Sequence, residues 1–305
     1  MISGQFCRYF NTGNTVWQST AKSLLGKLRK KTGYTFANCK KALDLHENDI
    51  TKAEAWLKEQ AQSMGWAKAQ KLQGRSTSQG LIAVMVENNY GALVEINCET
   101  DFVARNKTFQ GLAEIVVATT LKYAGSLKNV DRINKTFLDA ELLKNLSTID
   151  GKTIADHAAL TIGTLGENIS VKRGLCMTVD PSIQLVGCTH PAPVNPLPAS
   201  FGRYGALLAF QCQSENQQLG LQLCQHIIGM NPTKIGNAEG DKPISNTDEE
   251  TIMIHQDFLL DPSLSVQQVL LGAHAEILDF ARYEMGESNE STESTEDNIS
   301  QTISA

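Results

Sequence analysis

Residues that could do chemistry gather in one short stretch, between Asn97 and Asn106. The stretch follows an apolar run and precedes residues at helical spacing, so we expect a turn between a strand and a helix. Thr100 and Asp101 can begin that helix, because their side-chain oxygens accept hydrogen bonds from its first free amides. Phe102 then lies at the tip. Two interpretations are open: Phe102 packs under its own helix as a core residue, or it projects as an anchor for a partner protein.

Cys98 and Glu99 suggest a different chemistry, in which a thiolate attacks a substrate. A nucleophilic cysteine needs a neighbouring base, and no histidine lies near Cys98 in the sequence. A small core thiol is therefore the favoured interpretation. The chain also lacks a phosphate-binding glycine loop, a dinucleotide fingerprint, a nucleophile elbow and a His-Glu-x-x-His pair. We expect no catalytic residue, no cofactor and no nucleotide bound by this chain itself.

The histidines and cysteines are scattered rather than grouped at metal-ligand spacing. None of the seven cysteines forms a Cys-x-x-Cys pair, and the six histidines are spread from His46 to His274. The sequence therefore predicts neither a metal site nor a disulfide framework. Reduced thiols suit an intracellular compartment.

Charge is concentrated at the carboxyl end of the chain. The net charge is −6, but residues 287–305 hold five acidic residues and no basic one, which leaves −1 for the rest. A nearly neutral body argues against general electrostatic binding of nucleic acid, which needs clustered Lys and Arg. No apolar run reaches the ~20 residues that span a bilayer. We predict an acidic disordered tail over 287–305, and no direct binding of nucleic acid or membrane.

The amino terminus has the composition of an organelle-targeting segment. Residues 1–43 contain no Asp or Glu, and Arg8, Lys22 and Lys27 accompany several Ser and Thr. This composition is typical of a mitochondrial transit peptide, which we assign to residues 1–21. An ordinary disordered terminus is the alternative.

The next part of the chain is predicted to be a helical module followed by a linker. Residues 22–60 hold three segments with apolar stripes, separated at Gly33-Tyr34 and Asn48-Asp49. This pattern predicts a three-helix bundle of the ubiquitin-associated type. Residues 61–79 contain glycines and basic residues and are predicted to be a linker.

Two core subdomains are predicted to follow. Residues 80–168 begin with two β-rich runs joined by a short polar turn, which indicates a hairpin, and continue in helical patterns. Residues 169–286 repeat this order loosely, with a proline-rich loop between Pro191 and Pro198. Strands followed by helices in each half favour an α+β core of two subdomains with antiparallel sheets.

Several motifs, spaced in order along the chain, resemble those of the elongation factor Ts family. The segment from Glu95 to Asn106, Glu-Ile-Asn-Cys-Glu-Thr-Asp-Phe-Val-Ala-Arg-Asn, resembles the family signature. The other matching positions are Leu28–Gly33, Cys39–Leu43, Asp49-Ile50, Gly166–Ile169, Arg173, Phe280, Arg282, Tyr283, Gly286 and Glu287. Together they cover the chain from about residue 22 to residue 287, and several ordered motifs are more specific than any single one.

This resemblance implies a non-enzymatic guanine-nucleotide exchange factor that binds mitochondrial elongation factor Tu, a GTPase, as a one-to-one heterodimer in the mitochondrial matrix. Many bacterial members carry a coiled-coil insertion after the His226 helix; this chain has a short polar loop there, as mitochondrial forms do. The resemblance also implies that Phe102 wedges near the magnesium and phosphate site of the GTPase. Thr100, Asp101 and Val103 would position it.

The resemblance implies further contacts with the GTPase. In the helical module these are Arg29, Phe36, Ala37 and Lys40, and in the second subdomain His226 is a weaker contact. Family members often carry two methionines at the positions of Phe36 and Ala37, so the contact differs in detail. Four of these residues could also be explained without contact with the GTPase. Phe36 could be a core residue, Arg29 and Lys40 could lie on a solvated face, and His226 could be a surface histidine whose hydrogen bonds are made within the chain.

Two rival functions belong to other classes. The 22–60 bundle alone would suit a ubiquitin-type binding adaptor, but an adaptor does not need the Asn97–Asn106 turn in its matching context. The second rival function is that of an enzyme that uses Cys98 as its nucleophile.

Overall fold

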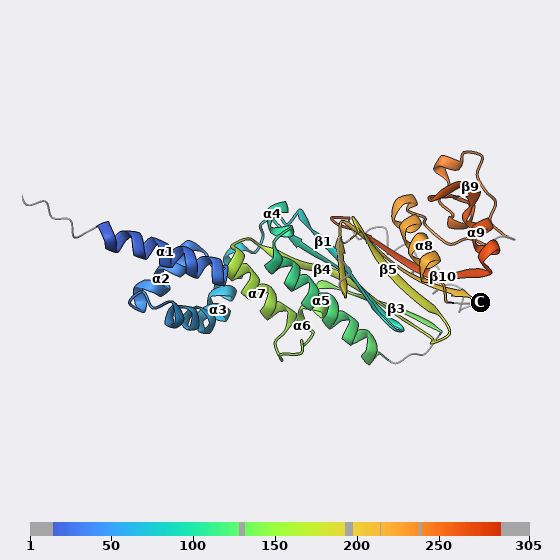
Figure 1. The fold of residues 1–305 in the computed structure, drawn as a ribbon. Coiled ribbons are helices and arrows are strands. Elements are labelled where there is room, and N and C mark those ends of the chain that lie inside the picture. Colours follow the sequence, from blue (N-terminus) through green and yellow to red (C-terminus); the bar gives the residue numbers. More distant parts are fainter. Residues whose placement is uncertain (1–14, 128–131, 193–197, 214, 238–239, 288–305) are drawn as a thin grey trace, which may run out of the picture. The chain divides into compact units, whose positions relative to one another are not determined.

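The computed structural model describes residues 15–127, 132–192, 198–213, 215–237 and 240–287. These residues form two compact units: the chain up to Gln73 together with Ala159–Gly166, and the chain from Gly74 onward without that segment. The first unit is helical, and the second combines helices with antiparallel sheets (Figure 1). The α+β prediction is therefore confirmed. The predicted acidic tail after Glu287 and most of the predicted transit peptide lie outside the described residues.

Three helices and the end of a fourth make up the first unit. They are α1 (Thr15–Thr32), α2 (Phe36–Leu45), α3 (Ile50–Leu72) and α7 (Ile154–Leu165), of which only the last turns belong here. Thr35 caps α2 by accepting a hydrogen bond from the Asn38 amide, and Asp49 caps α3 in the same way. The apolar faces meet in a small core of Leu28, Cys39, Ala42, Leu43, Ala53 and Leu57.

Two boundaries of the helical module differ from the prediction. α1 begins at Thr15, inside the segment assigned to a transit peptide, and α3 continues to Leu72, so residues 61–72 are helical rather than linker. The second difference concerns Gly65, one of the glycines that suggested a linker. A Cβ atom added there would lie 2.4 Å from the carbonyl oxygen of Ala159, so this glycine permits close packing within a helix and does not end one.

Two large antiparallel sheets form the centre of the second unit. The five-stranded sheet has the order β3-β4-β2-β1-β6, and the three-stranded sheet has the order β10-β7-β5. The first contains β1 (Gln79–Glu87), β2 (Tyr90–Cys98), β3 (Ile133–Leu138), β4 (Ile169–Val179) and β6 (Ala199–Gly202). The second contains β5 (Gln184–His190), β7 (Tyr204–Cys212) and β10 (Ala275–Glu284). β1 and β2 are the predicted hairpin.

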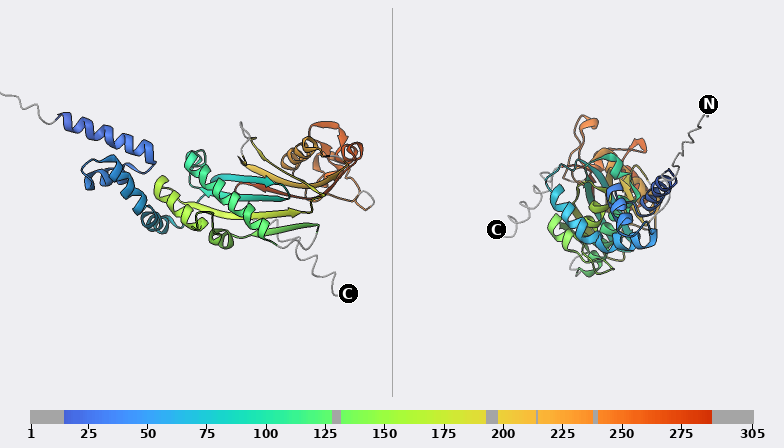
Figure 2. Two further views of the ribbon diagram at one scale, coloured as in Figure 1. Left: turned by 60° about the horizontal axis from the view of Figure 1, so that its bottom comes forward. Right: turned by 90° about the vertical axis from the view of Figure 1, so that its left-hand side faces the viewer.

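Helices cover the outer faces of the two sheets (Figure 2). α5 (Lys107–Ser126) packs on β1, β2 and β4, and α8 (Gln217–Met230) packs on β5 and β7. The inner faces meet in a shared core that includes Ile82, Leu93, Leu175, Leu207 and Ala209. The second unit is therefore layered as helix, sheet, sheet and helix, with each apolar face buried against a neighbour.

Shorter elements complete the second unit. They are α4 (Asp101–Ala104), α6 (Ala140–Asn145), α9 (Val266–Ala273), β8 (Asp257–Phe258), β9 (Asp261–Ser265) and the 3₁₀ turns η1 (Thr247–Glu249) and η2 (Met253–His255). Among the helices that the structure describes, none is long and apolar enough to cross a membrane.

The predicted division of the core at residue 168 does not separate the two sheets. β4 follows this boundary in sequence but pairs with β2 and β3, and β6 pairs with β1. Both strands from the predicted second half therefore complete the sheet of the first half. Strand partners depend on which faces and edges meet in the fold, and this information is absent from the order of apolar runs along the chain.

A buried ion pair joins β2 to β4 near the end of β10. Arg173 Nε lies 2.7 Å from a carboxylate oxygen of Glu95, whose side chain is completely buried. The Gly286 amide donates a 2.8 Å hydrogen bond to the same carboxylate, and the Arg173 guanidinium carbon lies 4.1 Å from the centre of the Tyr283 ring. The charges are thus paired and hydrogen-bonded, as buried charges must be.

Candidate partner-binding site

The turn between β2 and α5 presents Phe102 to solvent. Its side chain is 81% exposed, whereas the neighbouring Val103 is buried beneath α4. Thr100 caps a separate short helix, α4: its hydroxyl accepts a hydrogen bond from the Val103 amide at 3.4 Å. The long helix that Thr100 and Asp101 were expected to begin is α5, which starts at Lys107 with Asn106 as its cap. The structure therefore excludes the interpretation of Phe102 as a core residue. We call residues 99–104 the Phe102 turn.

An exposed ion pair flanks Phe102. Arg105 Nη2 lies 3.0 Å from a carboxylate oxygen of Asp101, one helical turn away. Pairs of this kind contribute only about 0.3–0.5 kcal/mol to stability. The pair therefore leaves Asp101 available at the surface beside the aromatic ring.

Glu167 holds the Phe102 turn from a distant part of the chain, a contact that reasoning from the sequence missed. Its carboxylate accepts hydrogen bonds from the amide and the hydroxyl of Thr100, at 3.1 Å and 2.8 Å. Glu99 does the reverse and accepts a 2.7 Å hydrogen bond from the Asn168 amide. The resemblance of residues 166–169 to a family motif was the only signal in the sequence, and it did not indicate this pairing.

Cys98 is a core thiol and is not positioned as a nucleophile. Its side chain is completely buried, and the thiol donates a hydrogen bond to the Thr100 carbonyl oxygen at 3.2 Å. Burial, together with the negative charge of Glu167, raises the pKa of the Cys98 thiol to about 12. Near neutral pH the thiol therefore stays protonated, and the thiolate is the reactive form.

Cys98 should consequently react slowly with alkylating reagents in the native protein. A pKa about three units above the usual one reduces the thiolate fraction roughly a thousandfold at pH 8. Mass spectrometry of native protein treated with iodoacetamide should find the partly exposed Cys212 labelled well before Cys98. After unfolding in denaturant, both should label at similar rates. Rapid labelling of native Cys98 would contradict this account.

The predicted contact residues of the helical module share one surface. Arg29, Phe36, Ala37 and Lys40 are all exposed, and Phe36 is 56% exposed. The Arg29 guanidinium carbon lies 4.4 Å from the centre of the Phe36 ring, an arrangement in which cation and ring attract each other. The buried stripe of α2 uses Cys39, Ala42 and Leu43 instead, so Phe36 is not a core residue. We call Arg29, Phe36, Ala37 and Lys40 the helical patch.

His226 lies in the core, which corrects the prediction that it contacts a partner. Its side chain is completely buried on α8 and stacks on the Phe258 ring. One ring nitrogen accepts a 3.2 Å hydrogen bond from the Leu259 amide, and the other lies 3.0 Å from Gln256 Oε1. Burial lowers the pKa of this histidine, so it is neutral and joins α8 to the segment before β9. The pattern of apolar residues along a helix does not show whether a histidine is buried and hydrogen-bonded in the core or exposed at the surface.

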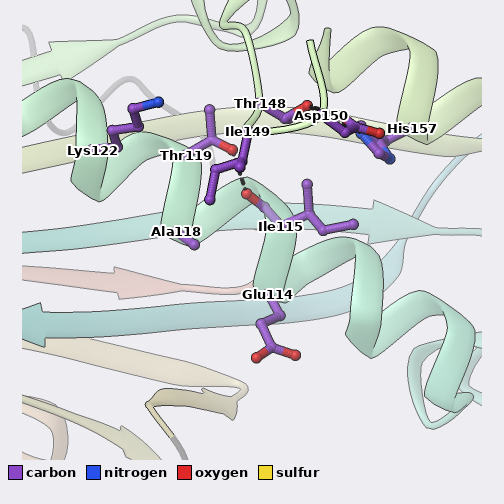
Figure 3. A pocket seen from close by; sticks show the side chains of 9 residues that line it. All are labelled: Glu114, Ile115, Ala118, Thr119, Lys122, Thr148, Ile149, Asp150 and His157. Atoms are coloured by element: carbon purple, nitrogen blue, oxygen red, sulfur yellow. Dashed lines mark hydrogen bonds and ion pairs between the residues drawn. The ribbon is translucent and has the colours of Figure 1, made fainter. Parts of the chain in front are cut away.

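A groove of about 410 Å³ lies elsewhere in the second unit, between α5 and the start of α7 (Figure 3). Its lining is mostly apolar, and Ile149, one of the lining residues, is 91% exposed. Asp150 lies beside it, and hydrogen bonds from Thr148 and His157 hold the pKa of that carboxyl well below its usual range. None of the residues that line the groove belongs to the Phe102 turn or to the helical patch.

Comparisons with known proteins identify relatives along most of the chain. The family model "Elongation factor Ts, mitochondrial, N-terminal" matches residues 7–67, and the model "Elongation factor TS" matches residues 99–246. Elongation factor Ts, mitochondrial, of Aedes aegypti is 49% identical over 281 residues, which cover 90% of this chain and 92% of the relative. The proteins of the same name from Drosophila melanogaster and Homo sapiens are 46% and 40% identical. These alignments cover 88% and 90% of this chain, and 86% of each relative.

These matches agree with the motifs quoted from the sequence and extend beyond them. They include the helical module and the sheet-containing unit, in the order in which the structure has them. The relatives are named as mitochondrial proteins, which gives this chain a mitochondrial location. The chain belongs to the elongation factor Ts family, in its mitochondrial form.

Proposed function

We propose that this protein is a guanine-nucleotide exchange factor for mitochondrial elongation factor Tu. It binds the GTPase one-to-one in the mitochondrial matrix, speeds the release of GDP and leaves as GTP takes its place. Membership of the elongation factor Ts family supports this role in translation elongation. The observation that carries the mechanism is the 81% exposed Phe102, held on a turn in which Thr100 caps the short helix α4.

Exchange of this kind needs no covalent chemistry, because it rests on linkage between two binding events. If the factor weakens the affinity of the GTPase for GDP, GDP weakens the affinity for the factor to the same extent. The factor and the nucleotide therefore displace each other in turn. This description fits a chain whose proposed site contains an aromatic side chain, a carboxylate and backbone, with its one thiol buried and protonated.

Phe102 acts as a wedge at the magnesium and phosphate site of the GTPase. A bound divalent ion is often the largest local charge at such a site and bridges protein side chains to the nucleotide phosphates. A rigid aromatic ring inserted beside the ion displaces the groups that hold it. The exposed Asp101 carboxylate adds a negative charge at the same place and disfavours the return of phosphate.

The helical patch makes a second contact with the GTPase. Exposed aromatic and arginine side chains are the residue types that contribute most to protein interfaces. Arg29 and Phe36 supply both in a stacked pair, and Lys40 adds a second positive charge on the same surface. This contact provides affinity, while the Phe102 turn provides the change in nucleotide binding.

Phe36→Ala should therefore weaken binding with little effect on the exchange step. Loss of an aromatic anchor typically costs about 1–2 kcal/mol of binding free energy, so the concentration for half-maximal exchange should rise roughly tenfold. The maximal rate at saturation should stay near that of the unaltered protein. Leu45→Ala is the matched control, because Leu45 is equally exposed, at 56%, at the other end of α2. A normal half-maximal concentration for Phe36→Ala would remove the helical patch from the proposal.

The direct test of the function is the release of a fluorescent GDP analogue from mitochondrial elongation factor Tu. With unlabelled GDP in excess, addition of this protein should raise the release rate in proportion to its concentration, up to a plateau. An unchanged rate with folded protein would overturn the proposal. Titration of the full chain with ubiquitin would then test the adaptor alternative, which specific binding would support.

A further inference from the structure

Two acidic residues, Glu99 and Glu167, hold the Phe102 turn through a reciprocal set of hydrogen bonds. Each lies next to the backbone amide that the other one binds: Glu167 binds the amide of Thr100, and Glu99 binds the amide of Asn168. We call these two residues the carboxylate clamp. The clamp joins distant parts of the chain, because Thr100 and Glu167 are 67 residues apart and Glu99 and Asn168 are 69 residues apart.

The Glu167 half of the clamp acts on Thr100, the cap of α4. Its two carboxylate oxygens accept from the Thr100 hydroxyl at 2.8 Å and 3.1 Å, and one also accepts from the Thr100 amide at 3.1 Å. Thr100 in turn caps α4 through the Val103 amide. The clamp thus fixes both the position of Thr100 and the orientation of its hydroxyl, and with them the start of α4. Hydrogen bonds to charged groups are the stronger kind.

The Glu99 half of the clamp completes a closed network. The Asn168 amide donates a 2.7 Å hydrogen bond to one carboxylate oxygen of Glu99, and Arg75 Nη1 lies 3.5 Å from the other. The Asn168 side chain donates a 2.9 Å hydrogen bond to the Arg75 carbonyl oxygen. Three segments of the second unit therefore meet at the base of the turn, and both glutamates are only partly accessible to solvent.

The turn needs such an external anchor. α4 has four residues, and so short a helix is not stable by itself. Ordering the backbone of the first turn costs more free energy than its few hydrogen bonds contribute. The exposed Asp101–Arg105 pair is internal to the local segment and cannot fix it to the sheet. Val103 is the only buried side chain of α4, and the Cys98 thiol bonds Thr100 only from the adjoining end of β2. The clamp adds hydrogen bonds to a segment that is distant in the chain.

We propose that Glu167 and Glu99 are positioning residues for nucleotide exchange. They hold the backbone of the Phe102 turn rigid, so that when the two proteins bind, the groups of the GTPase move and Phe102 stays in place. This inference rests on the proposed function. A wedge that moves with its turn displaces nothing, whereas a rigid one forces the opposing groups to move. The turn delivers its binding energy when the opposing groups of the GTPase move, rather than in the initial contact, so the clamp determines the maximal exchange rate more than it determines affinity.

The test separates the exchange step from binding. Glu167→Ala removes every hydrogen bond of one half of the clamp, and the maximal rate of fluorescent GDP release should fall about tenfold or more, as expected for loss of hydrogen bonds to a charged group. The half-maximal concentration should change far less. Glu99→Ala should act in the same direction, and Glu141→Ala, which alters an 80% exposed glutamate of α6, should leave both quantities unchanged.

A double variant distinguishes positioning from a general loss of stability. If the clamp acts through Phe102, adding Glu167→Ala to Phe102→Ala should reduce the maximal rate no further. Amide hydrogen exchange of the single variant should accelerate over residues 99–104 and stay unchanged in β7, which shows that the fold survives. A normal maximal rate for both clamp variants would overturn the inference. So would a Glu167→Ala effect of equal size with and without Phe102.

The same experiment keeps the two proposals apart. If the unaltered protein accelerates GDP release and Phe102→Ala does not, while both clamp variants behave normally, only the positioning role is lost. If the unaltered protein fails to accelerate release, the proposed function is lost, and the positioning role with it.

Discussion

Replacement of Phe102 by alanine should remove most of the exchange activity while leaving the fold intact. The side chain is 81% exposed, so truncation creates no cavity and should change the free energy of unfolding by less than about 0.5 kcal/mol. An aromatic anchor inserted into a partner is typically worth about 2–4 kcal/mol, which corresponds to a fall in the maximal rate of roughly thirtyfold or more. Stopped-flow release of fluorescent GDP at saturating protein measures this rate directly.

Ile149→Ala is the matched control for Phe102→Ala. Ile149 is another strongly exposed large apolar residue of the second unit, at 91%, and it lines the groove beside α5 (Figure 3). Its loss should leave GDP release unchanged. A maximal rate that is normal in Phe102→Ala, or equally reduced in both variants, would rule out Phe102 as the wedge.

Removal of one partner of the buried Glu95–Arg173 pair should have the largest effect on stability. Arg173→Met leaves the Glu95 carboxylate in the core without its closest counter-charge, 2.7 Å away in the intact protein. Breaking a buried pair in this way typically costs about 3–5 kcal/mol, a large part of the stability of a domain. Urea unfolding followed by circular dichroism should show a midpoint well below that of the unaltered protein.

Two further variants show whether the missing charge is the cause. Glu95→Gln combined with Arg173→Met removes the stranded buried charge and should recover part of the loss, while the partly exposed Lys172 and Glu287 keep their charges near solvent. Lys144→Met breaks the exposed pair of Lys144 with Glu141 and should change stability by less than about 1 kcal/mol. If Arg173→Met were no more destabilising than Lys144→Met, the buried Glu95–Arg173 pair would not be a major contributor to stability.

The sequence predicted those features that depend on local patterns. The hairpin of β1 and β2 follows from two β-rich runs around a polar turn, and the helix starts at Thr35, Asp49 and Thr100 follow from side chains that cap free amides. The same local logic predicted a turn at Phe102. It left the direction of the side chain open, because exposure is a property of the whole fold.

Features that depend on distant contacts were missed or predicted wrongly. β6 pairs with β1 and β4 joins the first sheet, although the order of apolar runs placed both in a separate subdomain. Gly65 lies inside α3, where the Ala159 backbone leaves no room for a side chain, and His226 is buried, where Gln256 and the Leu259 amide satisfy its ring. In each case the deciding partner is many residues away in the chain.

The most direct test of the central claim compares GDP release from mitochondrial elongation factor Tu in millimolar magnesium and in excess chelator, each with and without saturating protein. If Phe102 acts by disturbing the magnesium and phosphate site, the protein should accelerate release strongly in magnesium and much less once the ion is gone, because chelation has already removed the charge that the wedge displaces. Phe102→Ala should lose the magnesium-dependent part of the acceleration. No acceleration in magnesium would contradict the proposed function, and an equal acceleration in both conditions would contradict the wedge.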